Sequence, residues 1–229
     1  MIDTHTHILP GVDDGVEDYE EALEALEAME KAGISHVFAT PHFSTWRSFM
    51  ESYETYHERL ETLREKATEA GIGVKLYIGS EIDESDELFE FIDQAPSLNG
   101  TPYILVDFMM RDADIEEIAY ELKLYDYVLI IAHPERYPDV SLEAWEEVKA
   151  QGALLQVTAK HLIKKGQPQF NRLARKLLKE DLVDLVASDL HSPRHARTMK
   201  KAYDYVKRKK GKKVADALFY DNAKPIIDA

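Results

Sequence analysis

The sequence predicts an α/β protein built on a parallel sheet. Short apolar runs rich in Val, Ile and Leu alternate along the chain with longer amphipathic segments. Near-continuous apolar runs of this length are typical of strands buried on both faces. Repeated strand–helix alternation favours parallel strands joined by right-handed crossovers. Both an open doubly wound sheet and a closed barrel satisfy this alternation.

Seven strands are expected, each from a short apolar run. They are Met1–Thr4, His36–Thr40, Val74–Ile78, Tyr103–Phe108, Tyr127–Ala132, Leu154–Val157 and Val183–Ala187. The helices expected between them are Tyr19–Ala32, Glu51–Ala70, Asp114–Leu124, Ser141–Ala150 and Phe170–Glu180. Gly33 and Gly71 follow the first two helices as C′ residues, and Ser141 is a suitable N-cap for the fourth. No G-x-G-x-x-G or Walker A loop follows the first strand, which disfavours a nucleotide-binding sheet.

Length, cysteine content and net charge exclude several kinds of site and of protein. The 229 residues are expected to form one domain, residues 1–229, and the absence of Cys excludes disulfides, thiolate metal sites and cysteine nucleophiles. A formal charge of −15 disfavours nucleic-acid binding. No apolar run is long enough to insert into a membrane, and MIDTHTH lacks the features of a secretory signal, so a cytoplasmic protein is expected. The oligomeric state is left open.

A basic segment, Arg194–Lys213, stands apart from this acidic background. We interpret it as a solvated terminal helix, and the alternative is a docking face for an acidic partner.

Most predicted strands are followed by side chains that can bind a metal. These are His5, His7, His42, Glu81, Asp107, His133, Asp189 and His191. The carboxyl ends of the strands of a barrel open on one face, so these side chains are expected to converge there. Imidazole and carboxylate without thiolate suit Mn, Fe, Zn, Co or Ni better than Mg or Ca. The ligands exceed the four that one zinc takes, which favours two or three divalent ions.

Each motif has a plainer interpretation when it is taken alone. An isolated H-x-H or D-x-H is more often structural, and A-H-P-E-R is compatible with a simple turn; only the joint placement at strand ends favours a metal site. His36, His57 and His161 lack that placement and are interpreted as structural or surface residues.

Further polar residues follow the strands that carry these ligands. The loop Leu9–Gly15 contains two aspartates, one of which can add a ligand. Arg136 and Arg197 are candidate clamps for phosphate, with Arg194 competing for the second position.

The motifs together resemble the PHP (polymerase and histidinol phosphatase) superfamily, and within it the CpsB/CapC-type bacterial protein-tyrosine phosphatases of capsule and exopolysaccharide synthesis. The matching stretches, which span the chain in order, are MIDTHTHILPGVDDG, FATPHF, GSEI, YILVDF, IAHPERY, LLQVTAKHL and LVASDLH. The resemblance implies a distorted seven-stranded TIM-like (β/α)7 barrel of the PHP fold with a site for three metal ions.

The resemblance also implies the ligand sets. The first ion would be held by His5, His7, Glu81 and Asp189, the second by Glu81, Asp107 and His133, and the third by Asp14, His42 and His191. Arg136 and Arg197 would bind the phosphoryl group. Asp107 stands where the relatives usually have Glu, so weaker or water-mediated binding of the second ion is expected. The spacing from His191 to the downstream arginine also departs from the family pattern, so Arg194 remains an alternative to Arg197 for binding the phosphoryl group.

The resulting hypothesis is a metal-dependent protein-tyrosine phosphatase in which a metal-bridged hydroxide attacks phosphorus, with manganese as the expected metal. The implied substrate is the phosphotyrosine tail of a bacterial tyrosine kinase of polysaccharide assembly. His42 or a metal-bound water is a candidate proton donor to the leaving group. The alternatives are a phosphoesterase for a small ester such as histidinol phosphate, and a non-catalytic, metal-loaded module that binds a kinase.

Overall fold

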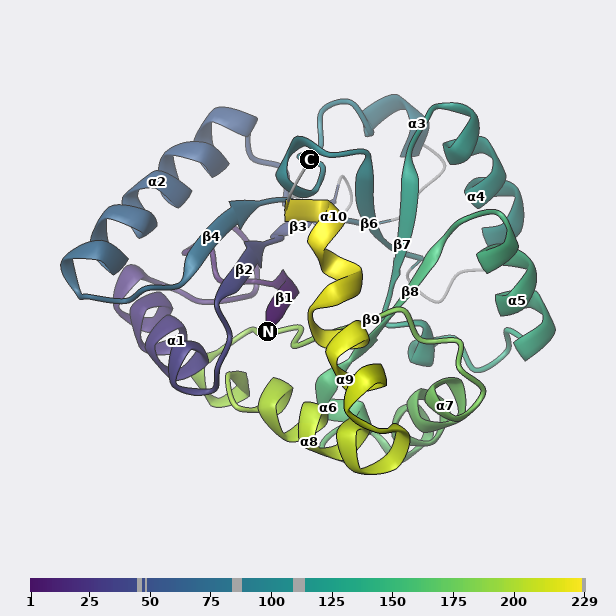
Figure 1. Cartoon of the computed structure of the whole chain (residues 1–229). Coiled ribbons are helices and arrows are strands. Elements are labelled where there is room, and N and C mark those ends of the chain that lie inside the picture. The colour runs from purple at the N-terminus through teal and green to yellow at the C-terminus, as the bar shows by residue number, and fades with distance from the viewer. Residues whose placement is uncertain (45–46, 48, 84–87, 109–113, 228–229) are drawn as a thin grey trace.

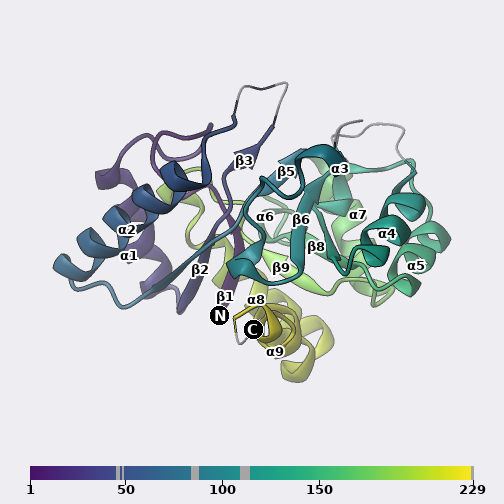
Figure 2. The ribbon, with the colours of Figure 1, turned by 90° about the horizontal axis from the view of Figure 1, so that it is seen from above.

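A computed structural model describes residues 1–44, 47, 49–83, 88–108 and 114–227. The strands lie in the middle of the molecule, and helices lie along its outside (Figures 1 and 2). Every pair of neighbouring strands among these residues is parallel. The predicted α/β class with parallel strands is therefore confirmed.

The strands divide into two hydrogen-bonded sheets. Their bounds are β1 Ile2–Thr6, β2 His36–Ala39, β3 His42–Phe43, β4 Lys75–Ile78, β5 Glu81–Asp83, β6 Tyr103–Asp107, β7 Val128–Ala132, β8 Leu154–Thr158 and β9 Leu185–Ala187. One sheet has the order β1-β2-β4, and the other has the order β3-β5-β6-β7-β8-β9. Within the described residues the ladders do not form a single closed barrel.

Two strands were not predicted, and both begin with a candidate ligand. β3 starts at His42 and β5 starts at Glu81, each a few residues after a predicted strand has ended. Pro41 lacks an N–H for the ladder, so β2 cannot continue unbroken into β3. Pro41 still accepts a hydrogen bond from the Glu81 N–H at 2.9 Å, which keeps the two short strands aligned.

The first and last strands also lie side by side. A parallel bridge joins Thr6 to Leu190, and the His7 N–H donates to the Leu190 carbonyl at 2.8 Å. The Asp189 N–H donates to the His5 carbonyl at 3.1 Å. The carboxyl end of β1 is thereby tied to the segment that follows β9.

All five predicted helices are present, with small shifts at their ends. The helices are α1 Tyr19–Lys31, α2 Tyr53–Glu69, α3 Leu88–Phe91, α4 Ile115–Leu124, α5 Leu142–Ala150, α6 Ala159–Leu162, α7 Pro168–Lys179, α8 Thr198–Lys210, α9 Lys212–Phe219 and α10 Lys224–Ile227. Ser141 caps α5 by accepting from the Ala144 N–H at 3.1 Å, as predicted. Most of the basic segment Arg194–Lys213 forms α8, and its last two residues begin α9. In the part of the chain described here, no helix is long and apolar enough to cross a membrane.

The core lies on both faces of the strands. Most buried apolar residues, such as Leu26, Leu60 and Trp145, pack between strands and helices. A second cluster lies on the opposite strand faces and contains Ile2, Phe38, Leu98, Leu105, Ile130, Ala132 and Leu185. Ala223 and Ile226 from the C-terminal segment join this cluster, and α10 lies in front of the strands in Figure 1. Burial of each large apolar side chain contributes about 1.5–3 kcal/mol.

Candidate metal centre

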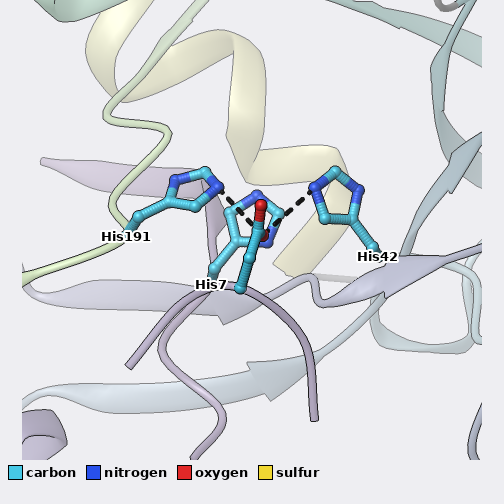
Figure 3. Close-up of side chains that lie close together, drawn as sticks. His7, His42 and His191 are labelled. Atoms are coloured by element: carbon cyan, nitrogen blue, oxygen red, sulfur yellow. Dashed lines mark ion pairs between the residues drawn. The ribbon is translucent and has the colours of Figure 1, made fainter. Parts of the chain in front are cut away.

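Four of the predicted ligands form one group. His7 directly follows β1, Asp14 lies in the loop after it, His42 begins β3 and His191 follows β9. One ligand atom from each of the four lies within 4.8 Å of the others. Asp14 Oδ1 is 3.5 Å from His42 Nε2 and 3.4 Å from His191 Nε2. Figure 3 shows His7, His42 and His191 close together, and its dashed lines from His42 and His191 mark these two ion pairs. The hydrogen bond with His191 helps to hold the pKa of Asp14 below its ordinary value.

Glu81 lies at the centre of the whole cluster and is fully buried. Its carboxylate oxygens lie close to four imidazoles: those of His5 (3.3 Å), His7 (3.3 Å), His42 (3.1 Å) and His133 (2.8 Å). Burial by itself would raise the pKa of Glu81, but the surrounding histidines hold it well below its ordinary value. Glu81 is therefore an ionised carboxylate in contact with several candidate ligands, as a bridging ligand would be.

A third group joins Glu81, Asp107 and His133. Asp107 Oδ2 is 3.8 Å from His133 Nε2. Asp107 Oδ1 accepts a hydrogen bond from the Tyr137 hydroxyl at 2.5 Å, which fixes the carboxylate. The shorter side chain thus still reaches the group, and the expectation of weaker metal binding there stays a prediction.

Asp189 lies beside these groups. Its Oδ1 is 3.8 Å from His7 Nε2 and 3.4 Å from His191 Nδ1. Its Oδ2 accepts hydrogen bonds from Arg136 Nη2 at 2.7 Å and from Lys160 Nζ at 2.9 Å. The geometry therefore differs in one detail from the implied ligand sets: His7 belongs to two groups, whereas Asp189 lies outside the three tightest ones.

The two histidines of the H-x-H motif are oriented by polar partners behind them. His5 Nδ1 is 2.8 Å from Gln156 Oε1, and His7 Nδ1 is 2.7 Å from Asp13 Oδ2. These contacts leave Nε2 of each ring facing Glu81. Outer partners of this kind fix the tautomer and orientation of metal-binding histidines. Of the two loop aspartates, the resemblance implied Asp14 as the ligand, and Asp13 orients His7 instead. Gln156 was not predicted, although it lies in the motif LLQVTAKHL.

The three predicted arginines differ in whether they contact the ligand cluster. Arg136 reaches Asp189, as described above. Arg194 and Arg197 are exposed, and in the described part of the chain neither makes a hydrogen bond or ion pair with the cluster. Arg47 was not predicted, yet its Nη1 lies 3.2 Å from His42 Nε2 and its Nε lies 3.2 Å from Asp83 Oδ2. Isolated arginines in loops carry no sequence signal that would have revealed this contact.

The three histidines interpreted as structural lie outside the cluster. His36 stacks on Tyr77, and His57 lies exposed on α2. His161 is buried and pairs with Glu135.

The cluster fits divalent transition metals. Five imidazoles and four carboxylates, with no thiolate, converge in a mostly buried region. His42 Nδ1 and His133 Nδ1 are buried without a hydrogen-bond partner among the described residues, and His42 Nδ1 lies beside Glu81. Burial lowers the pKa of His7, but Asp13 and Glu81 outweigh burial and raise it well above its ordinary value. Metal-free, the centre therefore holds protons where cations would bind.

Comparison with known proteins shows the family of this chain. The family profile of "Capsular polysaccharide synthesis, CpsB/CapC" matches residues 1–228. The chain belongs to the CpsB/CapC family. The predicted family is thereby confirmed. A tyrosine-protein phosphatase CpsB of Streptococcus pneumoniae is 31% identical to this family member over 99% of this chain and 98% of the relative.

Solved structures show the same fold. One belongs to the crystal structures of YwqE from Bacillus subtilis and CpsB from Streptococcus pneumoniae, described as metal-dependent tyrosine phosphatases. It matches this CpsB/CapC chain with a TM-score of 0.85 and 27% identity, covering 94% of this chain and 90% of the other. A histidinol phosphate phosphatase of Lactococcus lactis matches with a TM-score of 0.53 and 12% identity, covering 95% and 94%, which shows a shared fold alone.

Proposed function

We propose that this chain is a metal-dependent phosphomonoesterase that acts on phosphotyrosine in proteins. The observation that carries the proposal is the convergence of nine imidazole and carboxylate ligands from strand ends spread between positions 5 and 191, with Arg136 beside them. The family membership and the names of its relatives, tyrosine-protein phosphatases, support the same reaction.

We further infer that the two sheets are the walls of one distorted seven-stranded barrel in a single domain. The closeness of β2 to β3 and of β4 to β5 along the chain supports this, because each pair can act as one interrupted strand. The bridge between Thr6 and Leu190 supports closure between β1 and β9. A barrel also explains why ligands that follow both sheets meet at one place.

The proposed cofactors are two or three divalent transition-metal ions, with manganese expected. The ligands are those of the three groups described above together with Asp189. When bound, the ions supply Lewis acidity that activates water and neutralises charge on the phosphoryl oxygens.

The side chains prepare the site for a phosphoryl group. Glu81 stays ionised because histidines surround it, so it retains charge for cations at neutral pH. Arg136 is held by Asp189 and presents a guanidinium that matches the geometry of phosphate oxygens. A phenol leaves with a pKa of about 10, so strong help from a general acid is not required. We therefore assign His42 to the ligand set, not to proton donation.

The proposed substrate is a phosphotyrosine segment of a bacterial tyrosine kinase that serves polysaccharide assembly. The family description names capsular polysaccharide synthesis, and a phosphotyrosine tail fits an enzyme whose leaving group is a phenol.

The test is removal and return of metal during hydrolysis of p-nitrophenyl phosphate. Chelation should abolish turnover, and Mn²⁺ should restore it. Glu81→Gln should remain inactive after Mn²⁺ is returned, whereas the exposed control Glu116→Gln should behave like the unaltered protein. Turnover that survives complete demetallation would refute the proposal.

Hydrolysis of two further substrates distinguishes the proposed function from the small-ester phosphatase and the kinase-binding module. A phosphotyrosine peptide should be hydrolysed with a higher kcat/KM than histidinol phosphate. The reverse order would favour a small-ester phosphatase. No turnover of any phosphoester by the metal-replete protein would favour a kinase-binding module.

A further inference from the structure

Lys160 is a cation beside the metal centre and was not among the predicted site residues. It lies in α6, directly after β8, and its Nζ donates to Asp189 Oδ2 at 2.9 Å. Arg136 Nη2 donates to the same oxygen at 2.7 Å. Two positive charges therefore meet a single carboxylate oxygen, while the other oxygen of Asp189 faces the histidine cluster.

The two cations remain accessible where the carboxylate is not. The side chains of Lys160 and Arg136 are 22% and 29% exposed, whereas that of Asp189 is 2% exposed. An anion that approaches Asp189 from solvent meets these two cations first. Both cations carry a full positive charge toward that approach, and a phosphate ester carries about −1.5 to −2 at neutral pH.

A buried ion pair fixes the two cations relative to each other. Glu135 precedes Arg136, and His161 follows Lys160. Glu135 Oε1 accepts hydrogen bonds from His161 Nδ1 at 2.5 Å and from the Thr158 N–H at 2.9 Å. Glu135 and His161 are both buried, so the turn after β7 and the turn after β8 are held in one arrangement. Groups held in position before binding lose less entropy when the ligand arrives.

We propose that Lys160 binds a phosphoryl oxygen of the substrate together with Arg136. This inference rests on the proposed function and adds a substrate-binding residue to it. Arg136 supplies a planar fork of donors, and Lys160 supplies a compact charge on a flexible stem that follows the phosphoryl group. Asp189 holds both side chains at the place where the group docks.

Calorimetric binding of inorganic phosphate to the Mn²⁺-replete protein tests the inference without requiring turnover. Lys160→Met should raise the Kd for phosphate roughly 10- to 100-fold, the loss expected for one charge-assisted hydrogen bond. The control Lys165→Met removes the same charge from an exposed neighbouring position and should change the Kd by less than about twofold. Lys160→Gln gives a second neutral variant if the methionine variant does not fold.

A double variant separates direct binding from an effect through Arg136. The loss caused by Lys160→Met should persist in an Arg136→Met background. Equal phosphate affinity in Lys160→Met and Lys165→Met would overturn the inference, as would a loss that vanishes in that background. If the unaltered protein binds phosphate through Lys160 but hydrolyses no phosphoester, the proposed function fails and the inference stands; turnover with Lys160-independent phosphate binding gives the opposite result.

Discussion

Replacing Gly166 with alanine should loosen the buried pair that holds the turns after β7 and β8. A Cβ at this position would overlap Cδ2 and Nε2 of the His161 ring. Gly166 is not among the glycines with positive φ, so the perturbation is steric and involves no backbone strain. His161 is buried and packs edge-on against Phe170, which limits where the ring can move.

The expected loss of unfolding free energy depends on whether the His161 ring stays in place or moves. If the ring stays, the overlap strains the core by about 1–3 kcal/mol. If the ring moves, Glu135 loses its hydrogen bond from His161, and a buried carboxylate that loses such a bond costs about 1.5–3 kcal/mol. Urea unfolding of the metal-free protein should therefore show a loss of roughly 2–3 kcal/mol for Gly166→Ala.

A control variant and a double variant test whether overlap with the His161 ring causes the loss of stability. Gly73→Ala places its Cβ only against the flexible end of Glu30, so its unfolding free energy should change by less than about 1 kcal/mol. In a His161→Ala background the ring is gone, so Gly166→Ala should add almost nothing. Additive losses in the double variant would show that the His161 ring is not what Gly166 accommodates.

Three further outcomes are expected. Burial raises the pKa of Asp3 to about 6, so the native carboxyl holds its proton more tightly than the unfolded chain and stability falls as pH rises from about 4 to about 6. In urea unfolding of the metal-free protein, Asp3→Asn should reduce this pH-dependent decrease in unfolding free energy by about 3 kcal/mol. The same pH dependence in the variant and the unaltered protein would contradict the prediction. Tyr137→Phe removes the hydrogen bond to Asp107 Oδ1 and should weaken binding of the metal ion that Asp107 would help to hold about 10- to 100-fold, measured as metal content after dialysis. Unchanged metal content would argue against this role of Tyr137. Burial lowers the pKa of His7, but Asp13 and Glu81 together outweigh it and raise the pKa well above its ordinary value, so Mn²⁺ titration at pH 7 should release about one proton or more. A pH-stat trace without proton release would be inconsistent with a protonated His7.

Much of the site was predictable because the relevant information is local. The residues of H-x-H, D-x-H and A-H-P-E-R lie next to apolar runs that form strands, so their types and their places at strand ends are visible in the sequence. Parallel topology then brings the carboxyl ends of the strands together. The structure brings the predicted ligands into three overlapping groups, with Asp189 beside them.

The supporting contacts were not predictable because they join distant segments through side-chain geometry. Gln156 orients His5 across 151 positions, and Lys160 reaches Asp189 across 29. Neither Gln nor Lys is diagnostic at its place in the sequence, so only the folded arrangement reveals the partner. The exposure of Arg194 and Arg197 likewise depends on the path of the chain after β9.

By itself the sequence determined the parallel α/β class, the family and the residue types that gather around the centre, because periodicity and motif spacing are properties of the chain. Only the tertiary structure decided that β2 and β4 end before β3 and β5 begin, that Glu81 touches four imidazoles, and that Lys160 shares Asp189 with Arg136. These features depend on strand register and side-chain rotamers, which are set by packing between segments far apart in the chain.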